Sequence, residues 1–491
     1  MLPFANLLSI NRDSSVAVYQ QLANQLVGLV RQGVLTPGMK LPSSRELATL
    51  IGVHRKTIVA AYNEIALQGW LVSEPKKGIY ISSVLPELNP KSWAKQTSTV
   101  IAAEYEPFYY PVNAKTIAEP SADFYKYDLV IDDGLPDPRL APFELLTREY
   151  KNRIKKNIFF RGGANTFSAG SLSLRETLTA YLADTRGIQA NIKQLLVTQG
   201  AQMGIYIAAN LLLRPGDCVI VGEPGYFMAN SVFESLGAKI IRVPVDEDGL
   251  IITQVEEACS NHKINMLYVI PHHHHPTTVT LSPQRRMQLI SLAERFNFAI
   301  VEDDYDYDFH YQSSPYLPLI SSCNNRIIYI GSLTKCLASS IRVGFMVAPS
   351  NIINEAVKIR RQINLRGDFV MEDALAALIG AGDIGRHIKK SVSIYRERRD
   401  YISFLINDHL TDFLDFEIPA GGMALWLKFK TAYAVKRVAK DVSKQGLLMS
   451  DGTKYNTADI DYNAIRFGFA SLKKEELAAI VQILKNTLNA Y

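Results

Sequence analysis

Apolar residues recur at helical spacing near the start of the chain. In VYQQLANQLVGLVRQGVL, which begins at residue 18, one helical face carries Leu22, Leu26, Val27 and Val30. The next stretch, TPGMKLPSSRELATLIGV, opens with a Pro-Gly turn signal, and Ser43 or Ser44 can cap a second helix there. Gly52 ends that helix.

A third helical pattern follows Gly52 and ends at Gly69. Two helices joined by a short glycine-containing turn are the pattern of a helix-turn-helix. The segment after them, WLVSEPKKGIYIS, alternates like a β-hairpin with Lys76 and Lys77 at its tip. The pattern therefore predicts a winged helix-turn-helix over residues 1–82.

Short β-rich runs alternate with helical patterns from residue 127 to residue 491. Runs without a polar face are typical of strands buried on both sides, in a mostly parallel sheet between helices. We identify seven such runs: QLLVT, DCVIVG, AKIIRVPV, INMLYVIP, FAIVEDD, RIIYIGS and RVGFMVAP. Residues 83–126 have little periodicity and several prolines, and they are predicted to be a linker.

Composition and charge divide the chain in the same way. Eight lysines and arginines stand against four acids in the first 82 residues, so most of the net charge of +5 lies there. A small basic module favours a polyanion partner, such as double-stranded DNA. No apolar run is long enough to span a bilayer, the first ten residues lack a secretory pattern, and the four cysteines have no CxxC spacing. We expect a cytoplasmic protein with reduced thiols and no membrane contact.

The residues that follow the predicted strands carry the candidate chemistry, because ligands of such sheets bind beyond the carboxyl ends of the strands. After QLLVT, Gly200 opens a helix whose backbone N–H groups could face a phosphate. After DCVIVG, Tyr226 could stack on a flat ring or simply pack. After FAIV, the cluster EDD at residues 302–304 could bind a metal or pair with a protonated pyridine nitrogen.

The strand RIIYIGS leads into LTKCLASSIR, in which Lys335 follows Ser332 and Thr334, and Arg342 comes seven residues later. A single lysine is usually a solvated surface residue, but one at the end of a buried strand is a candidate amine for a Schiff base. An amine, a carboxylate, a phosphate cradle and a stacking ring together suit pyridoxal 5′-phosphate.

The sequence LTPGMKLPSSRELATLIGVHRKTIVAAYNEIALQGWL resembles the DNA-binding domain of GntR-type transcription regulators. The resemblance implies that operator DNA is contacted by a set of small and basic residues. These are Ser43, Ser44, Arg45, Arg55, Lys56, Thr57 and Lys77. The alternative is a three-helix interaction module that binds no DNA.

The order and spacing of the later motifs resemble fold-type I aminotransferases. By this resemblance Lys335 is the Schiff-base lysine and Arg342 binds the cofactor phosphate. Arg466 in AIRFGFASL resembles the arginine that binds a substrate carboxylate, and a smaller C-terminal α/β subdomain is implied from about residue 380. The other implied cofactor contacts are Asp303, Tyr305, Gly200, Ala201, Gln202, Tyr226, His275 and Ser332.

Four consecutive histidines in PHHHHPTT could suggest a metal site or a tag. A tag belongs at a terminus and a metal site needs ligands on separated turns, so no metal is expected. The stretch instead fits a loop of the aminotransferase-like family in length and in its Pro-Thr pair. One or two of the four histidines, His275 among them, are then expected near the cofactor and the others are expected to be solvated, while Thr278 replaces the family's closing glycine.

The whole chain resembles the MocR/GabR-type regulators, which fuse these two modules. The resemblance implies a regulator that senses a small amine or amino acid, or pyridoxal phosphate itself, and acts as a homodimer, with domain swapping possible across the linker. The alternatives are a working aminotransferase with an accessory DNA-binding module, and a protein in which the cofactor is only structural.

Overall fold

The computed structural model describes residues 3–12, 14, 16–74, 77–85, 126–155, 168–311, 315–323, 325–457 and 459–491. The chain divides into two compact units, Met1–Val112 and Asn113–Tyr491. Most of the predicted linker lies outside the described residues, as does Lys76 at the predicted wing tip. None of the helices within the described ranges is long and apolar enough to cross a membrane.

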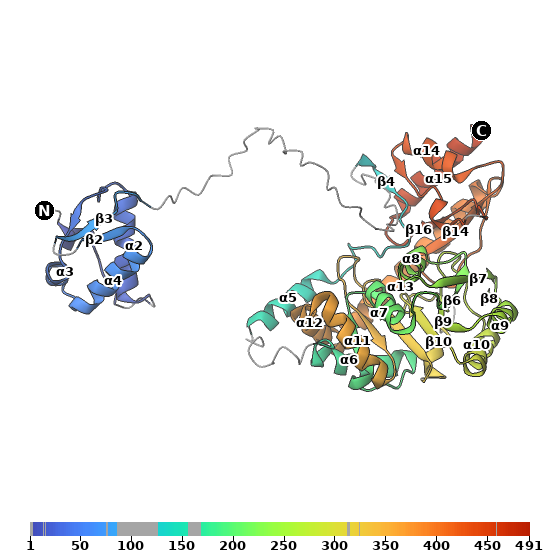
Figure 1. Cartoon of the computed structure of the whole chain (residues 1–491). Coiled ribbons are helices and arrows are strands. Elements are labelled where there is room, and N and C mark those ends of the chain that lie inside the picture. Colours follow the sequence, from blue (N-terminus) through green and yellow to red (C-terminus); the bar gives the residue numbers. More distant parts are fainter. Residues whose placement is uncertain are drawn as a thin grey trace, which may run out of the picture. The chain divides into compact units, whose positions relative to one another are not determined.

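The N-terminal unit is a helical core with a small sheet (Figure 1). Its helices are α1 (Phe4–Leu7), α2 (Val18–Arg31), α3 (Ser44–Ile51) and α4 (Arg55–Leu67), and its sheet has the order β1 (Lys40–Leu41), β3 (Gly78–Ile81), β2 (Leu71–Glu74). Ser43 caps α3: its hydroxyl accepts from the Glu46 amide at 3.3 Å, while the Glu46 carboxylate accepts from the Ser43 amide at 2.8 Å. Gly52 ends α3 in the left-handed conformation, with φ of 72°. The predicted winged helix-turn-helix is confirmed.

The C-terminal unit is built on an eight-stranded sheet, and all seven predicted strands are present in it. The central pairs β9–β10, β10–β11 and β6–β7 are parallel, while β12 runs antiparallel to both β11 and β5. The strand order is β5 (Leu195–Thr198), β12 (Gly344–Val347), β11 (Ile327–Ser332), β10 (Ala299–Asp304), β9 (Ile264–Val269), β6 (Cys218–Glu223), β7 (Lys239–Asp246), β8 (Gly249–Leu250).

Helices surround this sheet (Figure 1). Gly204 lets α7 approach β11 closely, because a Cβ there would lie 2.9 Å from Cγ2 of Ile330. The helices of this lobe are α5 (Phe143–Lys155), α6 (Leu172–Arg186), α7 (Ala201–Leu212), α8 (Phe227–Ser235), α9 (Ile252–Asn261), α10 (Pro283–Phe296), α11 (Ser350–Asn364) and α12 (Phe369–Gly380). Two short 3₁₀ turns also belong to it, η3 (Ile192–Gln194) and η4 (Leu319–Ser321).

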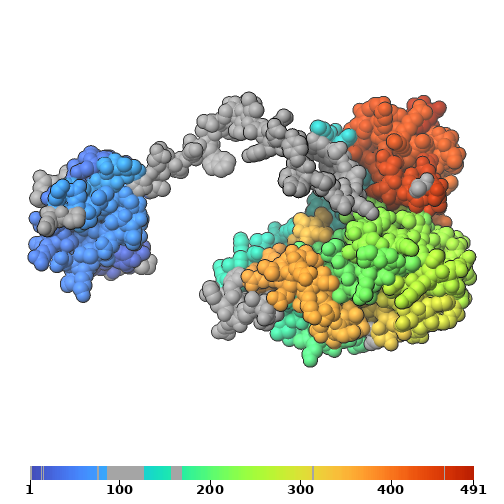
Figure 2. Space-filling view, in the orientation of Figure 1, coloured from blue at the N-terminus to red at the C-terminus, as the bar shows by residue number. Residues whose placement is uncertain are grey.

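The C-terminal end of the chain forms a lobe of its own, drawn in red in Figure 2. The long helix α13 (Asp383–His409) leads into a sheet of β13 (Leu414–Asp415), β14 (Ala424–Phe429) and β16 (Ala464–Gly468). The short strand β4 (Leu129–Val130) also belongs to this lobe, because it pairs with β15 (Leu447–Leu448). The remaining elements are α14 (Val435–Ser443), η5 (Thr453–Tyr455) and α15 (Lys474–Asn489).

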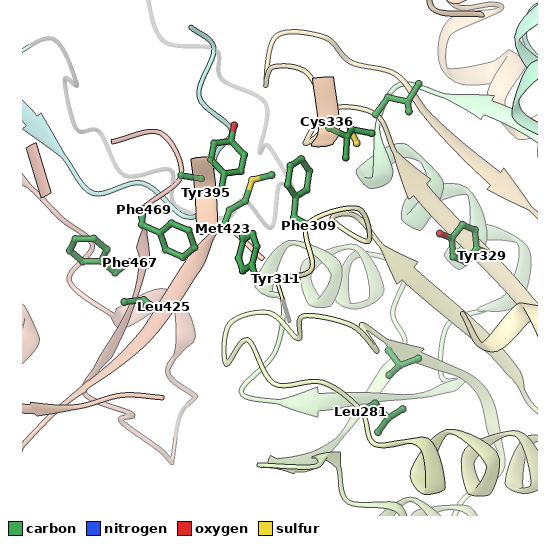
Figure 3. Packing of buried hydrophobic residues seen from close by; sticks show 14 of the residues in the cluster. Leu281, Phe309, Tyr311, Tyr329, Cys336, Tyr395, Met423, Leu425, Phe467 and Phe469 are labelled. Atoms are coloured by element: carbon green, nitrogen blue, oxygen red, sulfur yellow. The ribbon is translucent and has the colours of Figure 1, made fainter. Parts of the chain in front are cut away.

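Buried aromatic residues join the two lobes of the C-terminal unit (Figure 3). Phe309, in the segment after β10, packs 5.5 Å from the ring of Tyr395 on α13. The Tyr311 hydroxyl donates to the Gly422 carbonyl at 2.5 Å. The neighbouring Gly421 has no room for a side chain, because a Cβ would lie 2.2 Å from Nε2 of His273. This junction fixes the loop after β10 against the small lobe, next to the candidate site.

Candidate functional site

The exposed face of α4 and the capped start of α3 form the candidate DNA surface. Arg45, Arg55 and Lys56 are exposed there, and Nε of Arg55 lies 3.4 Å from the Ser44 hydroxyl. A shallow groove runs along α4 and is lined by Arg55, Lys56, Val59, Ala60 and Asn63. Sequence reasoning missed Asn63, although Arg55, Val59 and Asn63 follow one another at four-residue spacing on the predicted helix.

On the hairpin, Lys77 lies in the turn between β2 and β3. Its side chain is exposed and forms an ion pair with Glu74 at 3.2 Å. An exposed pair of this kind contributes little to stability, so Lys77 remains accessible to a phosphate.

A second candidate site is a cavity of about 260 Å³ in the C-terminal unit. It lies beyond the carboxyl ends of β10 and β11, where sheets of this kind bind ligands. Nine predicted residues line it: Ala201, Gln202, Tyr226, His275, Asp303, Tyr305, Ser332, Lys335 and Arg342. The lining also includes Asp133, Leu135, Ile270, Thr334 and Ser339, of which Asp133 and Leu135 come from a segment that sequence reasoning had not connected with this site.

Lys335 places its amine inside this cavity. The Nζ atom donates to the Gly134 carbonyl at 2.5 Å, and it lies 5.7 Å from the centre of the Tyr305 ring. Burial, together with the positive charge of Arg466, lowers the pKa of Lys335. An amine with a lowered pKa is more readily deprotonated. Only the deprotonated amine can act as a nucleophile toward an aldehyde.

Asp303 presents a carboxylate with an open hydrogen-bonding position. The Tyr268 hydroxyl donates to Oδ2 at 2.6 Å, whereas Oδ1 has no partner among the described residues. Burial raises the pKa of Asp303 to about 7, although the hydrogen bond from Tyr268 opposes that shift. A buried carboxylate of this kind suits a protonated ring nitrogen, which would supply both a donor and a compensating charge.

The start of α7 and Arg342 form a place for an anion. Gly200 precedes α7 with φ of 80°, and a Cβ on it would lie 2.8 Å from Nη2 of Arg342. The glycine thus allows both the turn and the close approach of the guanidinium, which contacts the Gln199 carbonyl at 3.4 Å. Free N–H groups at a helix start and a nearby arginine are what a phosphate group needs.

Arg466 lies behind Tyr305 rather than on the cavity wall. It is 2% exposed, and Nη2 donates to the Tyr305 hydroxyl at 3.1 Å. Nε donates to the Asp133 carbonyl at 3.2 Å, and Nη1 donates to the Pro276 carbonyl at 3.1 Å. Tyr305 in turn donates to the His273 carbonyl at 3.1 Å. The predicted carboxylate-binding arginine is therefore adjacent to the cavity and already engaged with groups of this chain.

The expectation that two or three of the four histidines are solvated was wrong, because all four are buried. His272 and His273 contact two carboxylates at the end of β10 and just beyond it. Nδ1 of His272 lies 3.0 Å from Asp304, the last residue of β10, and Nδ1 of His273 lies 2.8 Å from Asp306. His274 and His275 pair with Thr277 at 2.9 Å and Asp133 at 3.0 Å, and the His275 ring lies edge-on to Tyr226. Burial lowers the pKa of His274 to about 3 and of His275 to about 4, so both are neutral at pH 7.

Each histidine of the loop thus has a separate partner. Within the described ranges, no three or more His, Cys, Asp or Glu side chains are grouped so that they could hold a metal ion.

Comparison with protein families identifies both parts of the chain. The family described as aminotransferase class I and II matches residues 157–484, about two thirds of the sequence. The chain belongs to the aminotransferase class I and II family. In front of this domain, the gntR family of bacterial regulatory proteins matches residues 18–81. A GntR-type helix-turn-helix therefore precedes the aminotransferase class I and II domain, as the sequence motifs predicted.

Curated relatives share this arrangement over nearly their full length. The probable rhizopine catabolism regulatory protein MocR of Rhizobium meliloti is 25% identical over 96% of both chains. The transcriptional regulator TauR of Rhodobacter capsulatus is 26% identical over 92% of this chain and 93% of its own. The pyridoxine biosynthesis regulator PdxR of Corynebacterium glutamicum is 25% identical over 98% of both chains.

Solved aminotransferases share the fold of the C-terminal unit. Kynurenine aminotransferase of Pyrococcus horikoshii, determined with PMP, superimposes with a TM-score of 0.69 at 23% identity, over 75% of this chain and 92% of the enzyme. An archaeal alanine:glyoxylate aminotransferase gives a TM-score of 0.69 at 25% identity, over 74% of this chain and 91% of the enzyme.

The residues of the cavity fit pyridoxal 5′-phosphate. Oδ1 of Asp303 has no hydrogen-bond partner among the described residues, so it can accept from the ring nitrogen. Arg342 lies so close to Gly200 that no larger residue fits at position 200, where the phosphate group would bind. Lys335 supplies a partly buried amine in the same cavity.

Proposed function

We propose that this protein is a DNA-binding transcription regulator whose aminotransferase-like domain holds pyridoxal 5′-phosphate and senses a small amine or amino acid. The observation that supports it most strongly is the convergence of Lys335, Asp303 and Arg342 on one cavity, in a chain whose full-length relatives are named as regulators. The proposed organisation is a DNA-binding domain at 1–82, a linker at 83–126 and an effector domain at 127–491.

In this proposal each residue of the cavity has a specific task. When bound, pyridoxal phosphate supplies an aldehyde that reacts reversibly with amines. Lys335 would be the residue that holds the cofactor through its amine, and Asp303 would pair with the ring nitrogen. Tyr226 stacks on the ring, while the other cofactor contacts divide between the phosphate end (Gly200, Ala201, Gln202, Ser332, Arg342) and the phenolic oxygen (Tyr305, His275).

The effector is proposed to carry both an amine and a carboxylate. Its amine would be placed beside Lys335, and its carboxylate would bind Arg466, whose planar fork suits two carboxylate oxygens. Arg466 belongs to the small lobe and Lys335 to the large lobe. A ligand that binds both residues therefore favours one arrangement of the two lobes over the other. It shifts the equilibrium between these two arrangements only as far as its affinities for them differ.

Operator DNA is the proposed partner of the N-terminal unit, and the chain is proposed to act in the cytoplasm as a homodimer. A two-fold dimer presents paired recognition helices to two half-sites of an operator, and a linker of about 40 residues is long enough to permit domain swapping.

The experiment that tests this function is an operator-binding assay on the full-length protein loaded with pyridoxal phosphate, with a panel of amines and amino acids. The same samples are assayed for transamination with 2-oxo acids. The proposal expects at least one ligand to change the affinity for DNA. Steady transamination by a protein whose DNA affinity no ligand alters would instead identify an enzyme with an accessory DNA-binding module.

A further inference from the structure

Asp133 lies on the cavity wall in a ring of four donors from the rest of the C-terminal unit. The Tyr455 hydroxyl donates to Oδ1 at 2.6 Å, and Nε2 of His275 donates to Oδ2 at 3.0 Å. Nζ of Lys454 lies 3.4 Å from Oδ2, and Nε of Arg466 lies 3.9 Å from Oδ1. The Asp133 side chain is still 32% exposed, so this carboxylate is accessible from the cavity.

These four side chains have the composition of a carboxylate-binding site. Two are permanent cations and two are neutral donors, because His275 is uncharged at pH 7. Burial opposes ionisation of Asp133, but the hydrogen bond from His275 and the charges of Lys454 and Arg466 hold its pKa below the usual range. Without the Asp133 carboxylate, Lys454 and Arg466 would keep no ion pair among the described residues.

The position of the four donors around Asp133 relative to Lys335 matters for a ligand that carries both an amine and a carboxylate. Residue 134 follows Asp133 directly, and its carbonyl is the acceptor for Nζ of Lys335. The amine that would carry the cofactor and the ring around Asp133 are therefore adjacent along one wall of the cavity.

We propose that Asp133 is an internal competitor of the effector: its carboxylate occupies the subsite formed by Arg466, Lys454, Tyr455 and His275, and the carboxylate of an amino acid binds there by displacing it. This inference rests on the proposed function, because it describes the effector subsite of the same cavity. Asp133 then determines specificity. Only a ligand whose carboxylate and amine both bind can replace it, whereas a simple amine or a simple carboxylate cannot.

Displacing Asp133 would also alter a connection between the lobes. The segment that carries it is fixed to the small lobe: the Asp132 carbonyl accepts from the Gly468 amide at 2.9 Å, and the Ser471 hydroxyl donates to the Asp132 carboxylate at 2.5 Å. His275 belongs to the large lobe, so the Asp133–His275 hydrogen bond links the two. An effector carboxylate that takes the place of Asp133 breaks this link at the moment it binds.

The test measures carboxylate binding directly, with sodium acetate as the probe and uncharged acetamide as its isostere. The full-length protein loaded with pyridoxal phosphate is compared with Asp133→Ala, at constant ionic strength, by calorimetric titration and by the rise in melting temperature with acetate concentration. Asp451→Ala is the matched control, because Asp451 is an exposed carboxylate of the same lobe that accepts hydrogen bonds from Thr453 and lies outside the ring around Asp133.

We expect Asp133→Ala to bind acetate at least tenfold more tightly than the wild type and the Asp451→Ala control, and not to bind acetamide. Equal acetate affinity in Asp133→Ala and wild type would overturn the proposal. Should Asp133→Ala not fold, Asp133→Asn keeps the side-chain size and removes the charge, and a gain of less than threefold there would also overturn it. Because the measurement uses no DNA, its failure is distinguishable from a failure of the regulator function.

Discussion

The hydroxyl of Tyr268 lies 2.6 Å from Oδ2 of Asp303, at the point where the buried strands β9 and β10 end side by side. This hydrogen bond satisfies one oxygen of the carboxylate and orients the other, which has no partner among the described residues, at the wall of the cavity. The pair therefore holds an acceptor in place before any ligand arrives. The carboxylate is buried without a compensating charge, and this has a consequence for stability.

Asp303→Asn should make the cofactor-free protein less sensitive to pH. The pKa of Asp303 is raised by burial from 3.8 to about 7, so its contribution to stability is fully present below pH 4 and is lost as the pH rises to about 7. Over that window the wild type should lose up to about 1.4 kcal/mol per pH unit relative to the variant. Urea unfolding of both proteins between pH 5 and pH 8 measures this difference, and parallel pH profiles would count against it.

Lys335→Ala should abolish covalent attachment of the cofactor while the fold remains. Lys335 lines the same cavity as the open carboxylate of Asp303, and the pKa of its amine is lowered by burial. We expect no cofactor to be retained after borohydride reduction and denaturation, compared with about one per chain in the wild type and in Lys358→Ala, whose lysine is exposed. A Lys335→Ala protein that still traps cofactor would show that another lysine is attached.

The sequence was sufficient to place the residues that follow buried strands. Four features could be found because each lies at the end of a β-rich run or within a few residues of it: Lys335, Asp303, Tyr226 and the turn at Gly200. Parallel strands bring their carboxyl ends together at one edge of the sheet. Asp133 could not be found in this way. It follows the two-residue strand β4, which is too short for a periodic signal, and its partners lie 142 and 322 residues away.

The histidine loop shows a different limit. Nothing in a run of four histidines indicates that each will find its own buried partner, since three of the partners come from other segments: Asp304 at the end of β10, Asp306 just beyond it, and Asp133 after β4. Thr278 keeps the backbone that a glycine would favour, with φ of 66°, which is strained for a β-branched residue. The threonine was visible in the sequence, but its left-handed backbone was not.

Gly200→Ala should weaken cofactor binding through the phosphate end. A Cβ at this position would lie 2.8 Å from Nη2 of Arg342, so the guanidinium must move away from the start of α7. We expect at least a tenfold loss in affinity for pyridoxal phosphate, measured by titration of its absorbance. Gly216→Ala is the control, because Gly216 also has a positive φ, of 90°, but nothing lies within 4 Å of its Cβ position. Equal losses in both variants would mean that backbone strain alone is responsible.

DNA binding should reside in the N-terminal unit and fall steeply with salt. Arg55→Ala and Lys56→Ala should each reduce the slope of log affinity against log salt by about one if that side chain contacts a phosphate. Asn63→Ala should instead cost about 1–3 kcal/mol on the specific operator if Asn63 reads a base, with little effect on non-specific DNA. Fluorescence anisotropy at several salt concentrations separates these effects. A protein that lacks residues 1–82 and still binds the operator would contradict the assignment.

The central claim is that a ligand in the aminotransferase-like domain changes the affinity of the protein for DNA. The most direct measurement is the operator affinity of the protein loaded with pyridoxal phosphate, with and without each amine and amino acid of the panel, for the wild type and for Arg466→Ala. We predict that at least one compound with an amine and a carboxylate shifts the wild-type affinity by about 5- to 150-fold. Arg466→Ala should keep the cofactor and the operator affinity but lose the shift. A normal response in Arg466→Ala, or an operator affinity that no ligand changes in the wild type, would contradict this account.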